Sequence, residues 1–286
     1  MALDYADLMA RRCRDRVTWG ERDAMLYALG IGLGTDPTNE RELRFVTEED
    51  QRVFPTFAVV LGFAGGPLSN LEIDRRFQLH GEHAIELFGA IPPAGAVVSE
   101  GRMLGAWDKG PGKGAVFCQE KLLYLEGSDK PLARILTTAF GRAEGGFGGP
   151  REGQPPPHTV PDRLPDARID IPTAGNQALI YRFSGDWNPL HVSPNFARSI
   201  GFERPILHGL CTFALTARAV LAAFAEGEPA RLHAHQARFS APVFPGETVS
   251  VDLWRDGDVV SFEARVTARN ATVIRNGRAV IGEPLA

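Results

Sequence analysis

The chain has 286 residues, 44% of them hydrophobic, which is enough for a full core in one large domain or two ordinary ones. Its 31 Lys and Arg against 35 Asp and Glu give a formal net charge of −4, and no window carries the dense basic run that nucleic-acid binding requires. The longest nearly continuous apolar run, residues 57–66, is about half of the ~20 residues needed to cross a bilayer. Composition therefore excludes nucleic acid as the main partner and a transmembrane helix.

The termini and the cysteines bear on the cellular compartment. The first residues, MALDYADLMARRC, place acids where a secretory signal carries positive charge and an apolar segment, so we expect no export. Cys13, Cys118 and Cys211 are widely spaced and form no CxxC pair, which is typical of a reducing environment. The last four residues, EPLA, differ from a Ser-Lys-Leu peroxisomal address. We expect a cytoplasmic protein with no membrane association.

The first predicted element is a helix. Thr18 and Glu21 have the spacing of a capping box, and a helix to about Leu29 follows. The next residues, GIGLG at 30–34, superficially resemble a dinucleotide-binding loop, but they follow a helix instead of a strand and lack the GxGxxG spacing. We interpret them as a glycine helix stop and a turn.

The rest of the N-terminal half is predicted to contain a short second helix and three strands. His80-Gly81 opens a helical stretch, residues 82–88, which Gly89 and Pro92-Pro93 terminate. Runs rich in β-branched and aromatic residues then predict strands over residues 96–107, 115–125 and 132–142.

A stretch rich in Gly and Pro, residues 145–165, divides the chain, because neither helix nor paired strand persists through such a sequence. We predict an N-terminal domain of residues 1–145, a linker of 146–166 and a C-terminal domain of 167–286. In the second half, apolar residues 209–225 predict a buried helix. The strands predicted there cover residues 232–243, 248–255, 259–269 and 272–281.

The two halves resemble each other in outline, which indicates a duplicated domain. In each, a His-Gly pair, His80-Gly81 or His208-Gly209, opens a helical stretch that precedes β-rich segments. An antiparallel sheet wrapped around one buried helix, formed twice, is an α+β fold.

The segment most informative about chemistry is residues 181–197, which place an acid, an amide and an imidazole within six residues: Asp186, Asn188 and His191. Gly185 and Pro189 bracket a turn that Asp and Asn side chains brace through Asx hydrogen bonds. Such bracing explains every residue of the turn except the histidine. The functional interpretation uses all three side chains, which converge on one small molecule, most economically a water.

Two further interpretations concern metal binding and the start of the apolar helix. One histidine with one carboxylate gives too few strong zinc ligands, and no HxxxH or HxH pair stands nearby, so we predict no metal site. Gly209 opens the apolar helix, where unpaired amides and the helix dipole favour developing negative charge. This predicts an oxyanion hole. The alternative is that Gly209 only permits close packing of the helix start.

The motif resembles the signature of the MaoC-like (R)-specific 2-enoyl-CoA hydratases, the hydratase 2 family, in which Gly-Asp-x-Asn-Pro-x-His is followed by a small residue. The matching positions are Gly185, Asp186, Asn188, Pro189, His191 and Ala197, with residues 206–209 as the downstream element. The resemblance covers nearly the whole chain and is closest to the two-domain peroxisomal multifunctional type. Its landmarks in the first half are residues 79–82, 108–110 and 145–149.

The resemblance implies a double hot-dog fold, in which the second half carries catalysis and the first half binds the acyl chain and CoA through loss of most of its central helix. It implies hydration of trans-2-enoyl-CoA to (3R)-3-hydroxyacyl-CoA, a homodimer, and no cofactor. Asp186 and His191 would be the catalytic pair, Asn188 would help to hold the water, and the Gly209 amide would polarise the thioester. His80, Gly81, Lys109 and Phe239 match positions that contact acyl-CoA in relatives.

Several alternatives stay open at this point. A hot-dog thioesterase, an acyl-carrier-protein dehydratase or a non-catalytic acyl-CoA-binding subunit would share the fold and would also bind an acyl thioester. Lys109 has a plain alternative as a solvated loop lysine, whereas for Cys211 we expect buried packing and no nucleophilic role. The sequence does not assign acid and base between Asp186 and His191, and it does not fix the acyl group.

Overall fold

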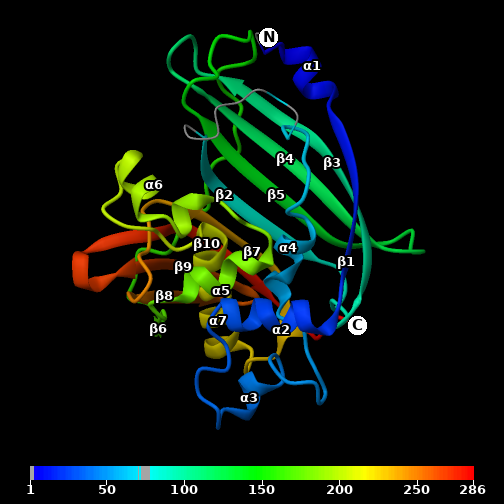
Figure 1. Cartoon of the computed structure of the whole chain (residues 1–286), viewed down its shortest axis with the longest axis vertical. Helices are drawn as coiled ribbons and strands as arrows, with labels where there is room; N and C mark the ends of the chain where they lie inside the picture. Colours follow the sequence, from blue (N-terminus) through cyan, green and yellow to red (C-terminus); the bar gives the residue numbers. More distant parts are fainter. Residues whose placement is uncertain (1–2, 70, 72–77) are drawn as a thin grey trace.

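The computed structural model describes residues 3–69, 71 and 78–286, and its described part contains one antiparallel sheet of ten strands (Figure 1). The order across the sheet is β1-β3-β4-β5-β2-β7-β10-β9-β8-β6. The strands of the N-terminal half are β1 (Arg12–Trp19), β2 (Gln78–Leu87), β3 (Gly95–Asp108), β4 (Ala115–Leu125) and β5 (Pro131–Gly141). Those of the C-terminal half are β6 (Ala167–Pro172), β7 (Leu232–Phe239), β8 (Thr248–Asp256), β9 (Val259–Val266) and β10 (Ala271–Ile281).

The two halves share one strand order. When the five strands of each half are counted in chain order, each half runs 1-3-4-5-2 from its outer edge inward. The second strands of the two halves, β2 and β7, pair antiparallel at the centre, with Glu82 opposite Arg238 and Glu86 opposite Ala234. The predicted α+β double hot-dog fold is confirmed, and the duplication is visible in the topology.

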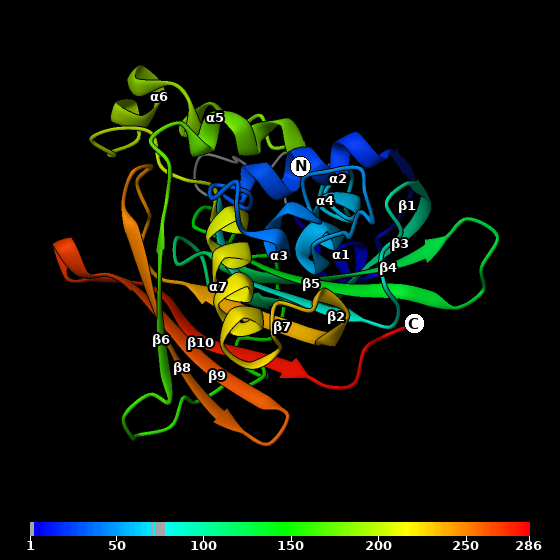
Figure 2. The ribbon, with the colours of Figure 1, turned by 90° about the horizontal axis from the view of Figure 1, so that it is seen from below.

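Helices cover one side of this sheet (Figure 2). Helix α7 (Gly209–Phe224) packs against the strands of the C-terminal half, and eleven of its sixteen residues are buried. Its apolar composition explains this position, because a helix without a polar face is stable only inside a core. The other helices are α1 (Tyr5–Ala10), α2 (Glu21–Gly30), α3 (Glu40–Leu43), α4 (Ala58–Leu61), α5 (Gln177–Tyr181) and α6 (Pro194–Ser199). Short 3₁₀ turns are η1 (Pro55–Phe57), η3 (Arg182–Ser184), η4 (Pro189–His191), η5 (Pro229–Arg231) and η6 (Thr267–Arg269).

The helix predicted over residues 82–88 is wrong, because residues 82–87 belong to strand β2. Its buried side chains, His83, Ile85 and Leu87, recur every second residue, which is the period of a strand with one buried face. His80-Gly81 is therefore not the counterpart of His208-Gly209. The N-terminal counterpart of α7 lies between β1 and β2, where the described residues form η1 and the four-residue α4 in place of a long central helix.

The predicted capping box at Thr18 and Glu21 is also wrong. Helix α2 begins at Glu21 with Gly20 as its N-cap, and the Gly20 N–H donates to the Asp23 carboxylate at 2.8 Å. Thr18 belongs to strand β1, which the sequence analysis missed together with β6. Both are edge strands rich in Arg and Asp, so their composition does not stand out from that of loops. The predicted glycine stop is confirmed, since Gly32 and Gly34 adopt positive φ values of 80° and 74° directly after α2.

The Gly/Pro-rich stretch forms no helix or strand over residues 142–166, all of which the structure describes. Hydrogen bonds attach this stretch to the sheet at several points. The Asp108 carboxylate accepts hydrogen bonds from the amides of Gly146 and Gly148 at 2.7 and 2.8 Å, and the His158 ring lies 2.8 Å from the Ser261 hydroxyl. The division into two domains stays a prediction, because the ten strands form one sheet. Among the described residues, no helix is both long enough and apolar enough to cross a membrane.

Candidate active site

The motif predicted to carry chemistry lies in the connection between β6 and α7, which consists of the short helices α5 and α6 and the 3₁₀ turns η3 and η4 with the loops between them. Gly185 has φ 109°, a backbone conformation that glycine adopts without strain. The Asp186 carboxylate accepts a hydrogen bond from the Asn188 amide at 3.1 Å, and the Asn188 side-chain oxygen accepts one from the Leu190 amide at 3.0 Å. The predicted Asx bracing is thus present, and it fixes the positions of Asp186 and Asn188.

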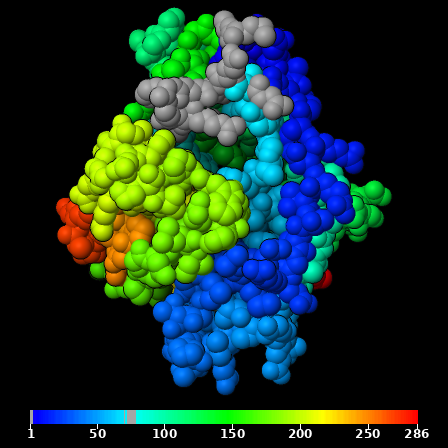
Figure 3. Space-filling model, viewed as in Figure 1, coloured from blue at the N-terminus to red at the C-terminus, as the bar shows by residue number. Residues whose placement is uncertain are grey.

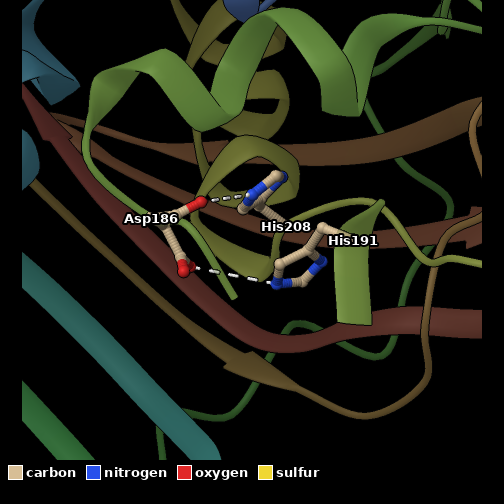
Figure 4. Close-up of side chains that lie close together, drawn as sticks. All are labelled: Asp186, His191 and His208. Atoms are coloured by element: carbon tan, nitrogen blue, oxygen red, sulfur yellow. Dashed lines mark hydrogen bonds and ion pairs between the residues drawn. The ribbon is translucent and has the colours of Figure 1, made fainter. Parts of the chain in front are cut away.

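His191 is buried, and its neighbours determine which ring nitrogen carries the hydrogen. Its Nδ1 lies 2.9 Å from the Ile206 carbonyl oxygen, so Nδ1–H donates to that oxygen. The other nitrogen, Nε2, faces the Asp186 carboxylate at 3.8 Å (Figure 4). Burial lowers the pKa of His191, although the Ile206 carbonyl and Asp186 oppose this effect. In the neutral ring Nε2 is a free base, and 3.8 Å leaves room for an oxygen atom bound to both side chains.

His208 is a neighbour that the sequence analysis did not place in the catalytic group. Its ring stacks on that of His191 with the centroids 3.7 Å apart, and its Nε2–H donates to the Asp186 backbone carbonyl at 3.2 Å (Figure 4). Burial, together with repulsion from His191, lowers the pKa of His208 to about 3. The ring therefore stays neutral and holds both catalytic candidates in place.

The same three side chains form the group of possible metal ligands in the described part of the chain, with donor atoms within 4.8 Å of one another. Their arrangement does not fit an ion. The two imidazole planes are stacked at an angle of 25°, so their in-plane lone pairs run side by side and do not converge. His208 also uses the Nε2–H for the Asp186 carbonyl.

Gly209 is the first residue of α7, so no preceding turn of helix supplies an acceptor for its amide. A Cβ atom added there would lie 3.5 Å from the Phe239 ring, which is ordinary van der Waals contact. Its φ is not positive either. Neither backbone geometry nor packing within the described chain requires glycine, and this argues against the packing alternative.

The four residues predicted to contact acyl-CoA fall into two groups. Phe239 lies beside Gly209, and the His80 ring contacts Phe239 with centroids 4.9 Å apart. His80 uses its ring nitrogens internally, toward His83 Nδ1 at 3.2 Å and the Glu82 backbone, so it offers a ligand only its ring surface. Gly81 follows in the same strand.

Lys109 lies apart from this group, at the loop that follows β3. Its ammonium group donates to the Arg151 carbonyl at 2.9 Å and approaches the Gln154 side-chain oxygen at 3.4 Å. These bonds tie the Gly/Pro-rich stretch to the end of β3. No contact among the described residues connects Lys109 with Asp186, and its predicted role in acyl-CoA binding stays a prediction.

A cavity of about 660 Å³ adjoins the catalytic segment at Gly185. It lies between that segment and the N-terminal half, and Figure 3 shows the surface of the yellow-green segment adjoining that of the blue N-terminal elements. Its apolar lining comes from β1, α2, η1, α4, the segment after α4 and η3, and includes Val17, Trp19, Leu26, Phe57, Val60, Leu61, Phe63, Leu68 and Phe183. Pockets of this size bury most of a drug-sized ligand.

Two protein-family models match the chain, one in each half. Residues 157–276 match the MaoC like domain, and residues 18–143 match the MFE-2 hydratase 2 N-terminal domain. The chain belongs to the MaoC-like hydratase 2 family. Members of this family are hydratases and dehydratases, so the chain is an enzyme of that class.

Several relatives are similar over most of the chain. It is 43% identical to 3-hydroxyacyl-thioester dehydratase Y of Mycobacterium tuberculosis, over 83% of this chain and 82% of the relative. It is 36% identical to peroxisomal enoyl-CoA hydratase 2 of Arabidopsis thaliana, over 91% and 89%. Among solved structures, a MaoC-like dehydratase from Phytophthora capsici superposes with a TM-score of 0.87 at 29% identity, covering 98% of both chains. Full-length peroxisomal multifunctional enzyme type 2 of Drosophila melanogaster gives 0.83 at 35% identity, covering 95% of this chain and 48% of that one.

In this hydratase 2 family member the end of helix α2 supports the catalytic group. A Cβ atom on Gly30 would lie 3.0 Å from the Tyr181 Cα, and the Tyr181 ring contacts His208 with centroids 4.9 Å apart. We expect Gly30→Ala to displace Tyr181 and to lower kcat by roughly tenfold, because small misplacements of catalytic groups are costly. The control is Gly20→Ala at the other end of α2, where the nearest atom to the new Cβ is 3.9 Å away. Equal kcat values for the two variants would contradict this prediction.

Proposed function

We propose that the protein hydrates trans-2-enoyl-CoA to (3R)-3-hydroxyacyl-CoA, and catalyses the reverse dehydration, with Asp186 and His191 as the catalytic pair. The observation that carries the proposal is the approach of His191 Nε2 to the Asp186 carboxylate, at 3.8 Å, beside the start of α7 and the cavity at Gly185. The family assignment supports the reaction class, and the relatives' names include enoyl-CoA hydratases and a 3-hydroxyacyl-thioester dehydratase. The alternatives of thioesterase, acyl-carrier-protein dehydratase and silent subunit have no comparable support.

The geometry suggests how the proton moves. A water bound between Asp186 and His191 gives one proton to His191 Nε2, and its oxygen forms a bond to C3 of the enoyl group. The electron pair of the C2–C3 double bond shifts toward the thioester oxygen, and the proton then passes from His191 to C2. Asp186 orients the water and stabilises the imidazolium, and Asn188 stands beside it. One water supplies both added groups, and the reaction is redox-neutral.

The developing charge on the thioester oxygen needs a donor, which we assign to the Gly209 amide. The first amide of a buried sixteen-residue helix combines an unpaired N–H with the positive end of the helix dipole. The acyl chain then extends past Gly185 into the cavity, whose lining comes mostly from the N-terminal half. In this proposal the N-terminal half, residues 1–145, binds the acyl chain, and the C-terminal half, residues 167–286, carries catalysis.

The proposal is tested by following the loss of enoyl-thioester absorbance with trans-2-decenoyl-CoA, and by oxidising the product with an (R)-specific 3-hydroxyacyl-CoA dehydrogenase. We expect hydration without release of free thiol, and a product that the dehydrogenase accepts. Free CoA released in place of hydration would favour the thioesterase alternative. A product accepted only by an (S)-specific dehydrogenase would refute the stereochemical assignment.

The role of Gly209 has its own test. We expect Gly209→Ala to keep or raise the melting temperature, because alanine favours helix and its Cβ would lie 3.5 Å from the Phe239 ring, an ordinary van der Waals distance. We expect kcat/KM to fall roughly 10- to 100-fold, because the methyl group crowds the amide. Gly175→Ala is the matched control, since a Cβ there would have no atom within 4 Å. Full activity of Gly209→Ala would remove the oxyanion hole from the mechanism.

We also propose a homodimer in the cytoplasm. The dimer rests on the resemblance to two-domain hydratases, and the compartment rests on the three widely spaced cysteines, which are typical of a reducing environment. The relatives include enzymes named as peroxisomal. Light scattering of the purified protein tests the first point, and a fluorescent fusion tests the second.

A further inference from the structure

A buried lysine on strand β4, Lys121, takes no part in the catalytic group but holds one wall of the cavity. The residue is only 7% exposed, and its ammonium group donates to the backbone carbonyls of Gly62, at 2.8 Å, Ala64 and Gly65. Burial lowers the pKa of this amine. A buried ammonium group is costly unless it is hydrogen-bonded and near opposite charge, so these three bonds define where the turn lies.

The turn in question, residues 62–66, directly follows α4 and supplies four consecutive lining residues of the cavity, from Phe63 to Gly66. It is seated tightly on the sheet. A Cβ added to Gly62 would lie 2.3 Å from the end of the Ile135 side chain on β5. Gly65 has φ 60°, and a Cβ there would lie 2.2 Å from the Asp15 carboxylate on β1. The turn therefore has little freedom to move toward the sheet.

The charges around the turn complement one another. Asp15 Oδ2 is buried and has no hydrogen-bond partner among the described residues, and the carboxylate is close enough to stabilise the charged form of Lys121. The carboxylate on β1 and the ammonium group on β4 thus lie on two strands beneath the same turn. Without Lys121, the carbonyls of Gly62, Ala64 and Gly65 would lose their shared donor, and water would have to replace it. Because the turn cannot move toward the sheet, we expect loss of Lys121 to let it move into the cavity, toward water.

We propose that Lys121 is a positioning residue that sets acyl-chain selectivity by fixing the cavity wall formed by residues 63–66. This inference rests on the proposed function, because it takes the cavity as the acyl site. A four-carbon enoyl group ends near the catalytic pair, whereas a ten-carbon group extends along the wall. Loss of Lys121 therefore affects binding of the long chain and leaves the chemical step intact.

The test compares crotonyl-CoA and trans-2-decenoyl-CoA as substrates of the wild type and of Lys121→Met, which keeps the length of the side chain and removes the donor. We expect KM for the decenoyl substrate to rise about tenfold with kcat little changed, since a contact made equally in the ground state and the transition state affects KM alone. KM for crotonyl-CoA stays within about twofold of the wild-type value. Lys121→Arg, which retains a charged donor, is expected to recover part of the selectivity.

The matched control is Glu120→Gln in the same strand. Glu120 points to the opposite face of β4, where its carboxylate pairs with Arg102 and Arg134, each at 2.6 Å. This control is expected to lower the melting temperature without changing the ratio of the two KM values. If Lys121→Met does not fold, Gly65→Ala displaces the same turn, and its KM ratio decides the question.

The outcomes separate this inference from the function on which it rests. If the wild type hydrates both substrates but the folded Lys121→Met or Gly65→Ala variant keeps the wild-type KM ratio, the inference is overturned and the proposed function stands. An equal rise in both KM values also overturns it. If the wild type hydrates neither substrate, the proposed function fails and the inference fails with it.

Discussion

Asp186→Asn and His191→Ala are each expected to lower kcat for hydration of trans-2-decenoyl-CoA by about 10²- to 10⁴-fold, the usual contribution of a positioned acid or base. Asparagine keeps the shape of the aspartate but removes the charge that orients the water and stabilises the imidazolium. Alanine removes the imidazole nitrogen that faces the Asp186 carboxylate, and His208 does not replace it because His208 donates to the Asp186 backbone carbonyl.

The reason for expecting so large an effect is that both groups act on the same water. His191 is held by the Ile206 carbonyl and by the stacked His208 ring, so no other imidazole can move into its place. The double variant is therefore expected to be scarcely worse than the more damaged single variant, because residues that act as a unit are not additive. Initial rates of the wild type, both single variants and the double variant measure this.

The matched control is Asp170→Asn, a substitution of an exposed carboxylate on β6. It is expected to retain wild-type kcat. Binding of a non-reactive saturated acyl-CoA should be similar in all the variants, which separates loss of chemistry from loss of binding. Wild-type hydration by either Asp186→Asn or His191→Ala, with the fold intact, would refute the assignment of the pair.

Stability is expected to fall steeply below pH 6.5, because the protein buries several histidines in their neutral form. Burial lowers the pKa of His80 to about 4 and the pKa values of His208 and His235 to about 3, and it places that of His83 well below its ordinary value of 6.5. The unfolded chain binds protons at these side chains near pH 6.5, whereas the folded chain does not. The free energy of unfolding therefore decreases as pH falls below 6.5, and it continues to decrease until the folded-state pKa values are reached.

The expected slope is roughly 1 kcal/mol per pH unit for each histidine that is charged only when unfolded. Four such groups remove several kcal/mol between pH 6.5 and pH 5, a large part of the 5–15 kcal/mol by which ordinary domains are stable. Urea unfolding at pH 8, 7, 6 and 5 measures the effect. The urea concentration at which half of the protein is unfolded is expected to change little between pH 8 and pH 7 and to drop sharply below pH 6.5.

A double variant, His83→Gln with His235→Gln, identifies the source of this slope. The two side chains pack on either side of Phe213 in α7, and His83 Nε2 and His235 Nδ1 are buried without a partner in the described residues. Glutamine does not titrate, so the pH dependence is expected to fall by about half even if the variant is less stable at pH 8. An unchanged slope would show that carboxylates, not these histidines, govern the acid response.

The strongly patterned segments were predicted well from the sequence. Strand β4 matches its predicted bounds at both ends, and α7 and β8 differ from theirs by a single residue. These segments have apolar or alternating patterns that only one type of element satisfies. Errors fell where the pattern was short or charged. The edge strands β1 and β6 were missed, and β2 was taken for a helix because its His-Gly start looked like that of α7.

The sequence alone determined the family, the location of the catalytic motif and the identity of Asp186, Asn188, His191 and Gly209 as candidates, because these residues lie within short, contiguous segments whose spacing is itself informative. The tertiary structure decided everything that depends on long-range contact. It placed His208 against His191, turned the ring nitrogens of His80 toward the protein interior, and brought Lys121 beneath a turn 56 to 59 residues earlier in the chain. Local spacing encodes turns and helix starts, whereas the partners of a buried side chain come from the pairing and stacking of distant strands, which no local pattern records.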